Sequence, residues 1–139
     1  MRGIASGRHD QVAYHRGMRD FKSLKIWQRA HALAIALHQR TRNFGRLGHA
    51  RLRNQLTGAA DSVHDTIAEG CGAATSKEFA RFLDMSIKSL NETEGHLLTA
   101  RDLHLFSLDE WEKYNSETIE IRKMTYTYRR KVVETAENE

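Results

Sequence analysis

The chain has 139 residues, of which 40% are hydrophobic and 29% are charged, and it contains no proline. A chain of this length forms one domain and buries a core without disulfide or metal support. The single cysteine, Cys71, excludes an internal disulfide and a four-thiolate metal site. The sequence has no apolar run of about 18 residues and no signal-peptide core, so we expect no membrane span and a cytoplasmic location.

The net charge of +4 conceals an asymmetry between the two halves of the sequence. Residues 1–60 hold twelve basic and two acidic residues, a net charge of +10, whereas residues 61–139 hold ten basic and sixteen acidic residues, a net charge of −6. A basic half attracts phosphate, and it equally attracts the acidic half of a second copy. We therefore expect nucleic acid or protein as the partner.

The first 19 residues are basic and lack apolar periodicity. They contain four arginines, with glycine at positions 3, 7 and 17. We interpret residues 1–19 as a flexible basic arm. Alternatively, they derive from a vector or from a misassigned start, in which case Met18 is a candidate for the natural start. The folded domain is expected over residues 20–135, with a frayed tail at 136–139.

Apolar residues recur at helical spacing in four segments, and the absence of proline favours long helices. The first three predicted helices span residues 23–42, 49–69 and about 76–103. The fourth opens at a second capping sequence, Ser107 to Glu110. Four helices joined by short connections predict an all-α fold, an antiparallel up-down-up-down four-helix bundle.

The hairpin between the second and third predicted helices, Asp61 to Ser86, carries clear local signals. We expect Gly70 and Gly72 to take the left-handed backbone conformation that ends many helices. Thr75 or Ser76 is then the residue that caps the next helix.

The turn between the first two predicted helices lies in the most basic part of the chain. Five arginines surround one bend: Arg40, Arg42, Arg46, Arg51 and Arg53. Guanidinium groups bind phosphate oxygens through paired hydrogen bonds, so these five are the candidate nucleic-acid-binding residues. The alternative is a solvated helix end, where cations also complement the helix dipole.

An acidic stripe follows on the second predicted helix, where Asp61, Asp65 and Glu69 recur every four residues. Like charges at this spacing repel each other, so we expect cations elsewhere to meet them. Arg81 and Lys77 across the turn are candidates, as is a neighbouring subunit. Asp61, Asp65, Glu69 and Arg81 are therefore the candidate subunit-contact residues.

The sequence offers no catalytic or metal-binding constellation. A di-iron site in a four-helix bundle needs carboxylates from every helix, yet residues 21–42 contain no Asp or Glu. Cys71 would follow a helix C-terminus, where the dipole raises the thiol pKa and weakens the nucleophile. Phosphate-loop, dinucleotide and nucleophile-elbow motifs are absent. We predict a protein that is not an enzyme and that needs no cofactor.

Several stretches resemble one known family. The segment FKSLKIWQRA at residues 21–30 is similar to the first helix of four-helix-bundle proteins encoded within intervening sequences of bacterial 23S rRNA genes. The likeness continues in IAEG at 67–70, SKEF at 76–79 and RFL at 81–83, and it covers roughly residues 20–130. The family often has Pro-Ser-Asn where this chain has His64-Asp65-Thr66, a change that favours helical continuation.

This resemblance implies a four-helix bundle that assembles as a ring-like homopentamer. It extends to the accessory proteins of diversity-generating retroelements, which look like this family and bind nucleic acid and a reverse transcriptase. The +10 and −6 halves are compatible with head-to-tail subunit contacts. We therefore expect an oligomeric adaptor whose basic surface binds RNA or DNA. The alternative is a protein–protein interaction module whose basic residues serve subunit contacts.

Overall fold

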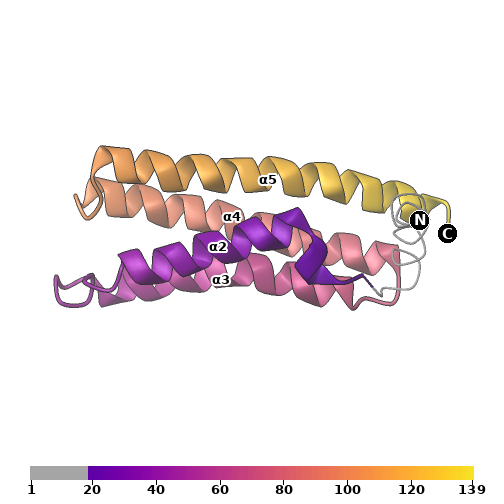
Figure 1. Ribbon diagram of the computed structural model, residues 1–139, viewed down its shortest axis with the longest axis horizontal. Coiled ribbons are helices and arrows are strands. Elements are labelled where there is room, and N and C mark those ends of the chain that lie inside the picture. The colour runs from indigo at the N-terminus through magenta and orange to yellow at the C-terminus, as the bar shows by residue number, and fades with distance from the viewer. Residues whose placement is uncertain (1–18) are drawn as a thin grey trace.

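The computed structural model describes residues 19–139, which form one turn of 3-10 helix and four long α-helices. The short helix η1 covers Phe21–Ser23, and the long helices are α2 (Lys25–Arg40), α3 (Ala50–Cys71), α4 (Ser76–Asp102) and α5 (Leu108–Glu137). The long helices lie side by side along the long axis of the molecule (Figure 1). The described residues contain no strand, and the predicted all-α four-helix bundle is confirmed.

Neighbouring helices run antiparallel, as the register of their contacts shows. Ser62 of α3 bonds to Ser89 of α4, and Thr66 one turn later bonds to Ser86. Residue numbers therefore rise on one helix as they fall on the next, and successive connections lie at alternate ends of the bundle (Figure 1). Two ion pairs between α4 and α5, Asp84–Arg129 and Glu94–Arg122, show the same antiparallel order.

The core lies along the shared axis of the four helices. Its members follow the apolar stripes of the sequence, because residues three and four positions apart share one helix face. Fully enclosing a large aliphatic side chain contributes about 1.5–3 kcal/mol each. The largest enclosed side chains include Leu37, Phe44, Leu56, Ile67, Phe79, Leu83, Leu90, Leu97, Ile121 and Val132.

The α3–α4 turn differs from the predicted one in the conformation of its glycines. Gly70 lies within α3, which continues to Cys71, and Gly72 follows with a φ of −89°. The prediction of left-handed glycines at these positions is therefore wrong. Gly70 is needed for space instead, because a Cβ there would lie 2.8 Å from both Phe79 Cδ1 and Phe82 Cβ.

Two predicted helix caps are confirmed. The Thr75 hydroxyl accepts a hydrogen bond from the Glu78 backbone N–H at 3.1 Å, at the start of α4. Ser107 and Glu110 form the full capping box at the start of α5. α5 then continues to Glu137, two residues beyond the predicted end of the bundle at 135.

The α4–α5 turn ends α4 with a left-handed residue that is not glycine. His104 has a φ of 60°, and its N–H bonds to the Arg101 carbonyl while the Leu105 N–H bonds to the Ala100 carbonyl, both at 2.9 Å. These two bonds form the Schellman pattern. The α4–α5 turn lies at the same end of the molecule as the α2–α3 turn (Figure 1).

In residues 19–139, none of the helices combines the length and the apolar character that a membrane span requires. Apart from Arg19, the basic arm predicted over residues 1–19 lies outside the described residues.

Candidate nucleic-acid interface

The α2–α3 turn is anchored to the bundle by a buried aromatic ring. Phe44 is fully enclosed, and its ring centroid lies 5.6 Å from that of Phe106 in the α4–α5 turn. The Phe44 carbonyl accepts a hydrogen bond from the His49 N–H at 2.7 Å. Gly48, which precedes His49, has a φ of 89°. The turn is therefore a fixed platform, with defined positions for the side chains that it carries outward.

Three of the five candidate arginines point away from the bundle. Arg42 and Arg46 on the turn and Arg51 in the first turn of α3 are exposed. In the part of the chain that the structure describes, no carboxylate, hydrogen-bond acceptor or ring contacts their side chains. Their guanidinium donors are thus available to an external anion.

Arg40 has a different environment, because its guanidinium joins α2 to α5. Its Nε lies 2.5 Å from Glu110 Oε2, and its Nη2 donates to Glu110 Oε1 at 3.0 Å and to the Leu105 carbonyl at 3.1 Å. The guanidinium carbon also lies 5.1 Å from the centroid of the Phe106 ring. Hydrogen bonds from Arg40 and from the Ser107 N–H lower the pKa of Glu110 to about 2.

Arg53 also has partners inside the molecule. Its Nη2 donates to the His38 carbonyl at 3.3 Å, which ties α3 to the last turns of α2. Its Nε is buried and has no hydrogen-bond partner among the described residues. Arg40 and Arg53 are thus structural contacts, and the outward-facing set is Arg42, Arg46 and Arg51.

A spacing pattern in the sequence could have identified the inward orientation of Arg40. Arg29, eleven residues earlier on α2, pairs with Glu117 of α5 at 2.5 Å. Eleven residues are about three helical turns, and the seven residues from Glu110 to Glu117 are about two. The two basic side chains of α2 therefore pair with two acidic side chains of α5, each pair on the facing sides of the helices.

The aspartates of the acidic stripe on α3 contact histidine side chains. Asp61 lies 2.9 Å from His38 Nε2 on α2, and Asp65 lies 3.3 Å from His64 Nδ1 on its own helix. Burial lowers the pKa of His64, whose side chain is only 14% exposed. Asp61 therefore has a partner on α2 within its own chain.

The remaining two candidate subunit-contact residues are exposed. Glu69 lies at the end of α3, and Arg81 lies one turn into α4 with its guanidinium carbon 5.3 Å from the Phe82 ring centroid. Within residues 19–139, no ion pair joins Arg81 or Lys77 to the acidic stripe. The charged groups of these side chains are exposed to solvent.

The groups considered for catalysis do not form an active site. Cys71 is 3% exposed, and burial raises the pKa of its thiol to about 12, so the nucleophilic thiolate is not formed near neutral pH. In the described part of the chain, no cluster of three or more His, Cys, Asp or Glu residues is placed to hold a metal ion.

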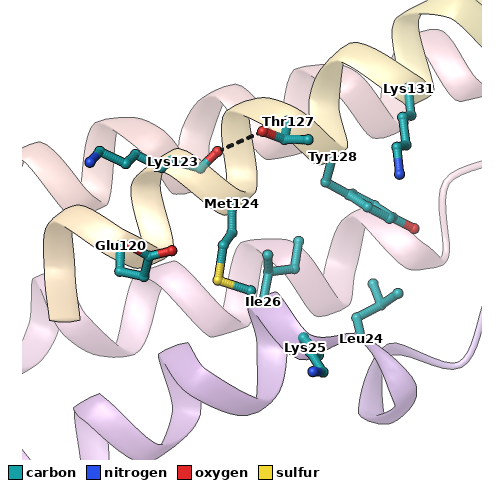
Figure 2. Close-up of a pocket in the computed structure, with 9 residues that line it drawn as sticks. All are labelled: Leu24, Lys25, Ile26, Glu120, Lys123, Met124, Thr127, Tyr128 and Lys131. Carbon is teal, nitrogen blue, oxygen red and sulfur yellow. Dashed lines mark hydrogen bonds between the residues drawn. The ribbon is translucent and has the colours of Figure 1, made fainter.

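A groove between α2 and α5 has no counterpart in the sequence-based predictions. It has a volume of about 350 Å³. Figure 2 shows side chains from the start of α2 and from the second half of α5 around it. No local pattern marks it, because its two walls lie almost 100 residues apart in sequence. The lining residues are Leu24, Lys25, Ile26, Glu120, Lys123, Met124, Thr127, Tyr128 and Lys131.

Comparisons with known proteins agree with this architecture. A crystal structure of a protein of unknown function from the S23 ribosomal protein family of Bacteroides thetaiotaomicron VPI-5482 superposes with a TM-score of 0.69. The two sequences are 18% identical over 74% of this chain and 96% of the other, a likeness that shows the fold. No curated protein matches. The family model for 23S rRNA-intervening sequence proteins matches residues 22–127, and the chain belongs to that family.

Proposed function

We propose that this protein is a non-enzymatic, oligomeric cytoplasmic adaptor whose α2–α3 turn binds the phosphate backbone of RNA or DNA. The observation that carries this proposal is the exposure of Arg42, Arg46 and Arg51 on one anchored turn. No acidic residue lies between positions 21 and 60, so no nearby carboxylate in the sequence offsets their charge.

The binding is electrostatic and independent of sequence. Each guanidinium presents planar N–H donors that match two phosphate oxygens. Because Phe44 holds the turn on the core, the backbone loses little conformational entropy when an anion binds. Three phosphate contacts to a single strand give a salt dependence with a slope of about −2 in a plot of log affinity against log salt.

The family supports RNA as the first ligand to test. Its description refers to an intervening sequence of 23S rRNA, and the similar crystal structure is assigned to a ribosomal protein family. The family resemblance also implies the ring-like homopentamer that we include in the proposal, with a solution mass of about five times the 16.0 kDa chain.

The test is fluorescence anisotropy with a labelled single-stranded RNA of about 20 nucleotides and a DNA of equal length. The variant R42Q/R46Q/R51Q is compared with K77Q/K88Q/R130Q, which removes three exposed cations from α4 and α5. We expect the first variant to lose at least about ten-fold in affinity and the second to lose much less. Equal losses in both variants, or no binding by the wild type, would show the proposal to be wrong.

One observation favours the second candidate, a protein–protein interaction module. The outward face of α2 is uncharged at its centre and includes Ile35, which is 44% exposed. In this alternative the exposed arginines contact the acidic stripe of a neighbouring subunit. Arg51→Glu should then reduce the solution mass measured by light scattering. A variant that stays assembled while losing RNA would rule this alternative out.

A further inference from the structure

The groove between α2 and α5 is a second surface, remote from the arginines of the α2–α3 turn. α2 packs less closely on α5 than on α3, and the opening between them exposes an apolar floor. Figure 2 shows Ile26 from α2 and Met124 from α5 facing one another across this floor. Leu24 and Tyr128 extend it beside them.

The two walls of the groove differ in rigidity. Leu24 and Ile26 are 7% and 4% exposed, so packing fixes their positions. Met124 is half-buried and its Sδ accepts a hydrogen bond from Arg29 Nη1 at 3.2 Å, but its unbranched side chain adapts to a bound group more readily than the branched Leu24 and Ile26. A fixed wall opposite an adaptable one suits the binding of apolar side chains from a partner.

The rim of the groove is basic. Lys123 and Lys131 lie eight residues apart on α5, about 12 Å along the helix, and Lys25 lies on the α2 side. All three lysines are exposed and have no ion pair within residues 19–139. Glu120 is the one acidic residue among those that line the groove, so the rim has a net positive charge.

We propose that this groove binds an acidic amphipathic helix of a partner protein. Two apolar side chains of that helix, one turn apart, pack on the half-buried Met124 and Tyr128 above the buried Ile26, and carboxylates beside them pair with Lys25 and Lys131. This is helix-in-groove recognition, in which apolar anchors provide affinity and flanking charges set orientation. A volume of about 350 Å³ suits a few anchoring side chains.

The apolar floor distinguishes this surface from the phosphate-binding turn. A nucleic-acid backbone would satisfy the lysines but leave the half-buried side chains of Met124 and Tyr128 in contact with water, without the gain that apolar burial provides. An acidic helix satisfies both parts of the groove. We therefore expect peptide binding to depend on apolar side chains as well as on charge.

The probe is a fluorescein-labelled peptide of about 15 residues with two leucines four positions apart and glutamates on both flanks. A second peptide replaces the leucines by alanine at the same charge. Anisotropy is measured with the full chain at about 150 mM salt, where weak surface attraction is screened. We expect the leucine peptide to bind at least about ten-fold more tightly than the alanine peptide.

Variants of the chain then locate the bound peptide. K25E/K131E should weaken binding at least about ten-fold. K77E/K88E makes the same charge change at exposed positions of α4 and should leave the affinity unchanged. Circular dichroism confirms that each variant is folded before it is compared.

Three outcomes would overturn this proposal: equal affinity for the two peptides, equal effects of the two lysine variants, or displacement of the peptide by RNA as readily as by unlabelled peptide. R42Q/R46Q/R51Q should retain full peptide affinity, because its changes lie on the α2–α3 turn. Failure of the groove proposal can therefore be told apart from failure of the RNA proposal.

Discussion

The two connections on either side of α3 depend on glycine for opposite reasons. At the α3–α4 end, Gly70 has negative φ but no room for a Cβ beside the Phe79 ring. At the α2–α3 end, Gly48 has a φ of 89° and no atom within 4 Å of the place a Cβ would take. The first connection is closed by packing around Gly70, and the second leaves open space beside Gly48.

The arginines show the same division between packing and exposure. Arg40 ends α2 bound to Glu110, whereas Arg42, two residues later, is exposed. Neighbouring arginines in one basic segment therefore differ, because some pair with another helix and others face solvent. We therefore expect the α3–α4 connection to contribute mainly to stability, and the α2–α3 connection is the one for which we propose anion binding.

The largest predicted effect is that of Gly70→Ala. Its Cβ would force apart α3 and the aromatic side chains of α4, so we expect a loss of about 2–3 kcal/mol in the free energy of unfolding. The matched control is Gly58→Ala in the same helix, where no atom lies within 4 Å. That change should raise the free energy of unfolding by about 0.5–1 kcal/mol. Urea denaturation followed by far-UV circular dichroism measures both, and shifts of the same sign would contradict this interpretation.

A smaller loss is expected for Gly48→Ala. The backbone alone opposes this substitution, since a left-handed conformation costs a residue with a Cβ about 1 kcal/mol. Gly45→Ala in the same turn is the control, because its Cβ would make an ordinary 3.7 Å contact with that of Ala50. The same denaturation experiment should show little change for the control. A loss at Gly48 as large as that at Gly70 would mean that the two connections do not differ as described.

Breaking the Arg40–Glu110 pair should have a still smaller effect, of about 0.5–1 kcal/mol after allowance for solvent screening. Glu110 is 36% exposed, and its pKa is lowered from 4.5 to about 2, so its contribution is complete above pH 4.5 and is lost as the pH falls toward 2. Glu110→Gln keeps a side chain suited to the capping box. We expect it to lower stability at neutral pH and to flatten the pH dependence between these two values.

The control for the ion-pair experiment is Glu112→Gln, which changes an exposed carboxylate on the same helix. Denaturation curves recorded across the acidic range should be nearly unchanged for this variant. If both variants flatten the pH dependence of the free energy of unfolding equally, the acid sensitivity comes from overall charge and not from the Arg40–Glu110 pair.

The helices could be predicted because their signals are local. The cap at Thr75 and the capping box at Ser107 fix two helix starts, and the apolar stripes fix the buried faces. The role of Gly70 differs from the predicted one because a glycine near a helix end has the same local signature whether it supplies a positive φ or space for the next helix. Only the approach of Phe79 distinguishes the two.

The candidate site could be predicted only in part, since side-chain orientation depends on distant residues. Arg40 contacts a carboxylate 70 residues away, so its orientation is revealed only when the basic spacing of α2 is compared with the acidic spacing of α5. The groove between α2 and α5 depends on how closely those two helices pack, and its lysines belong to ordinary solvated faces in the sequence. Local patterns identified the basic segment but not which of its members face outward.

The salt dependence of RNA binding tests the central claim most directly. Log affinity is plotted against log salt between about 50 and 200 mM for the wild type, Arg40→Gln and R42Q/R46Q/R51Q. We predict a slope of about −2 for the wild type and for Arg40→Gln, and a slope near zero for the triple variant. A triple variant that keeps the wild-type slope, or an Arg40→Gln variant that loses it, would contradict the assignment of anion binding to the outward arginines.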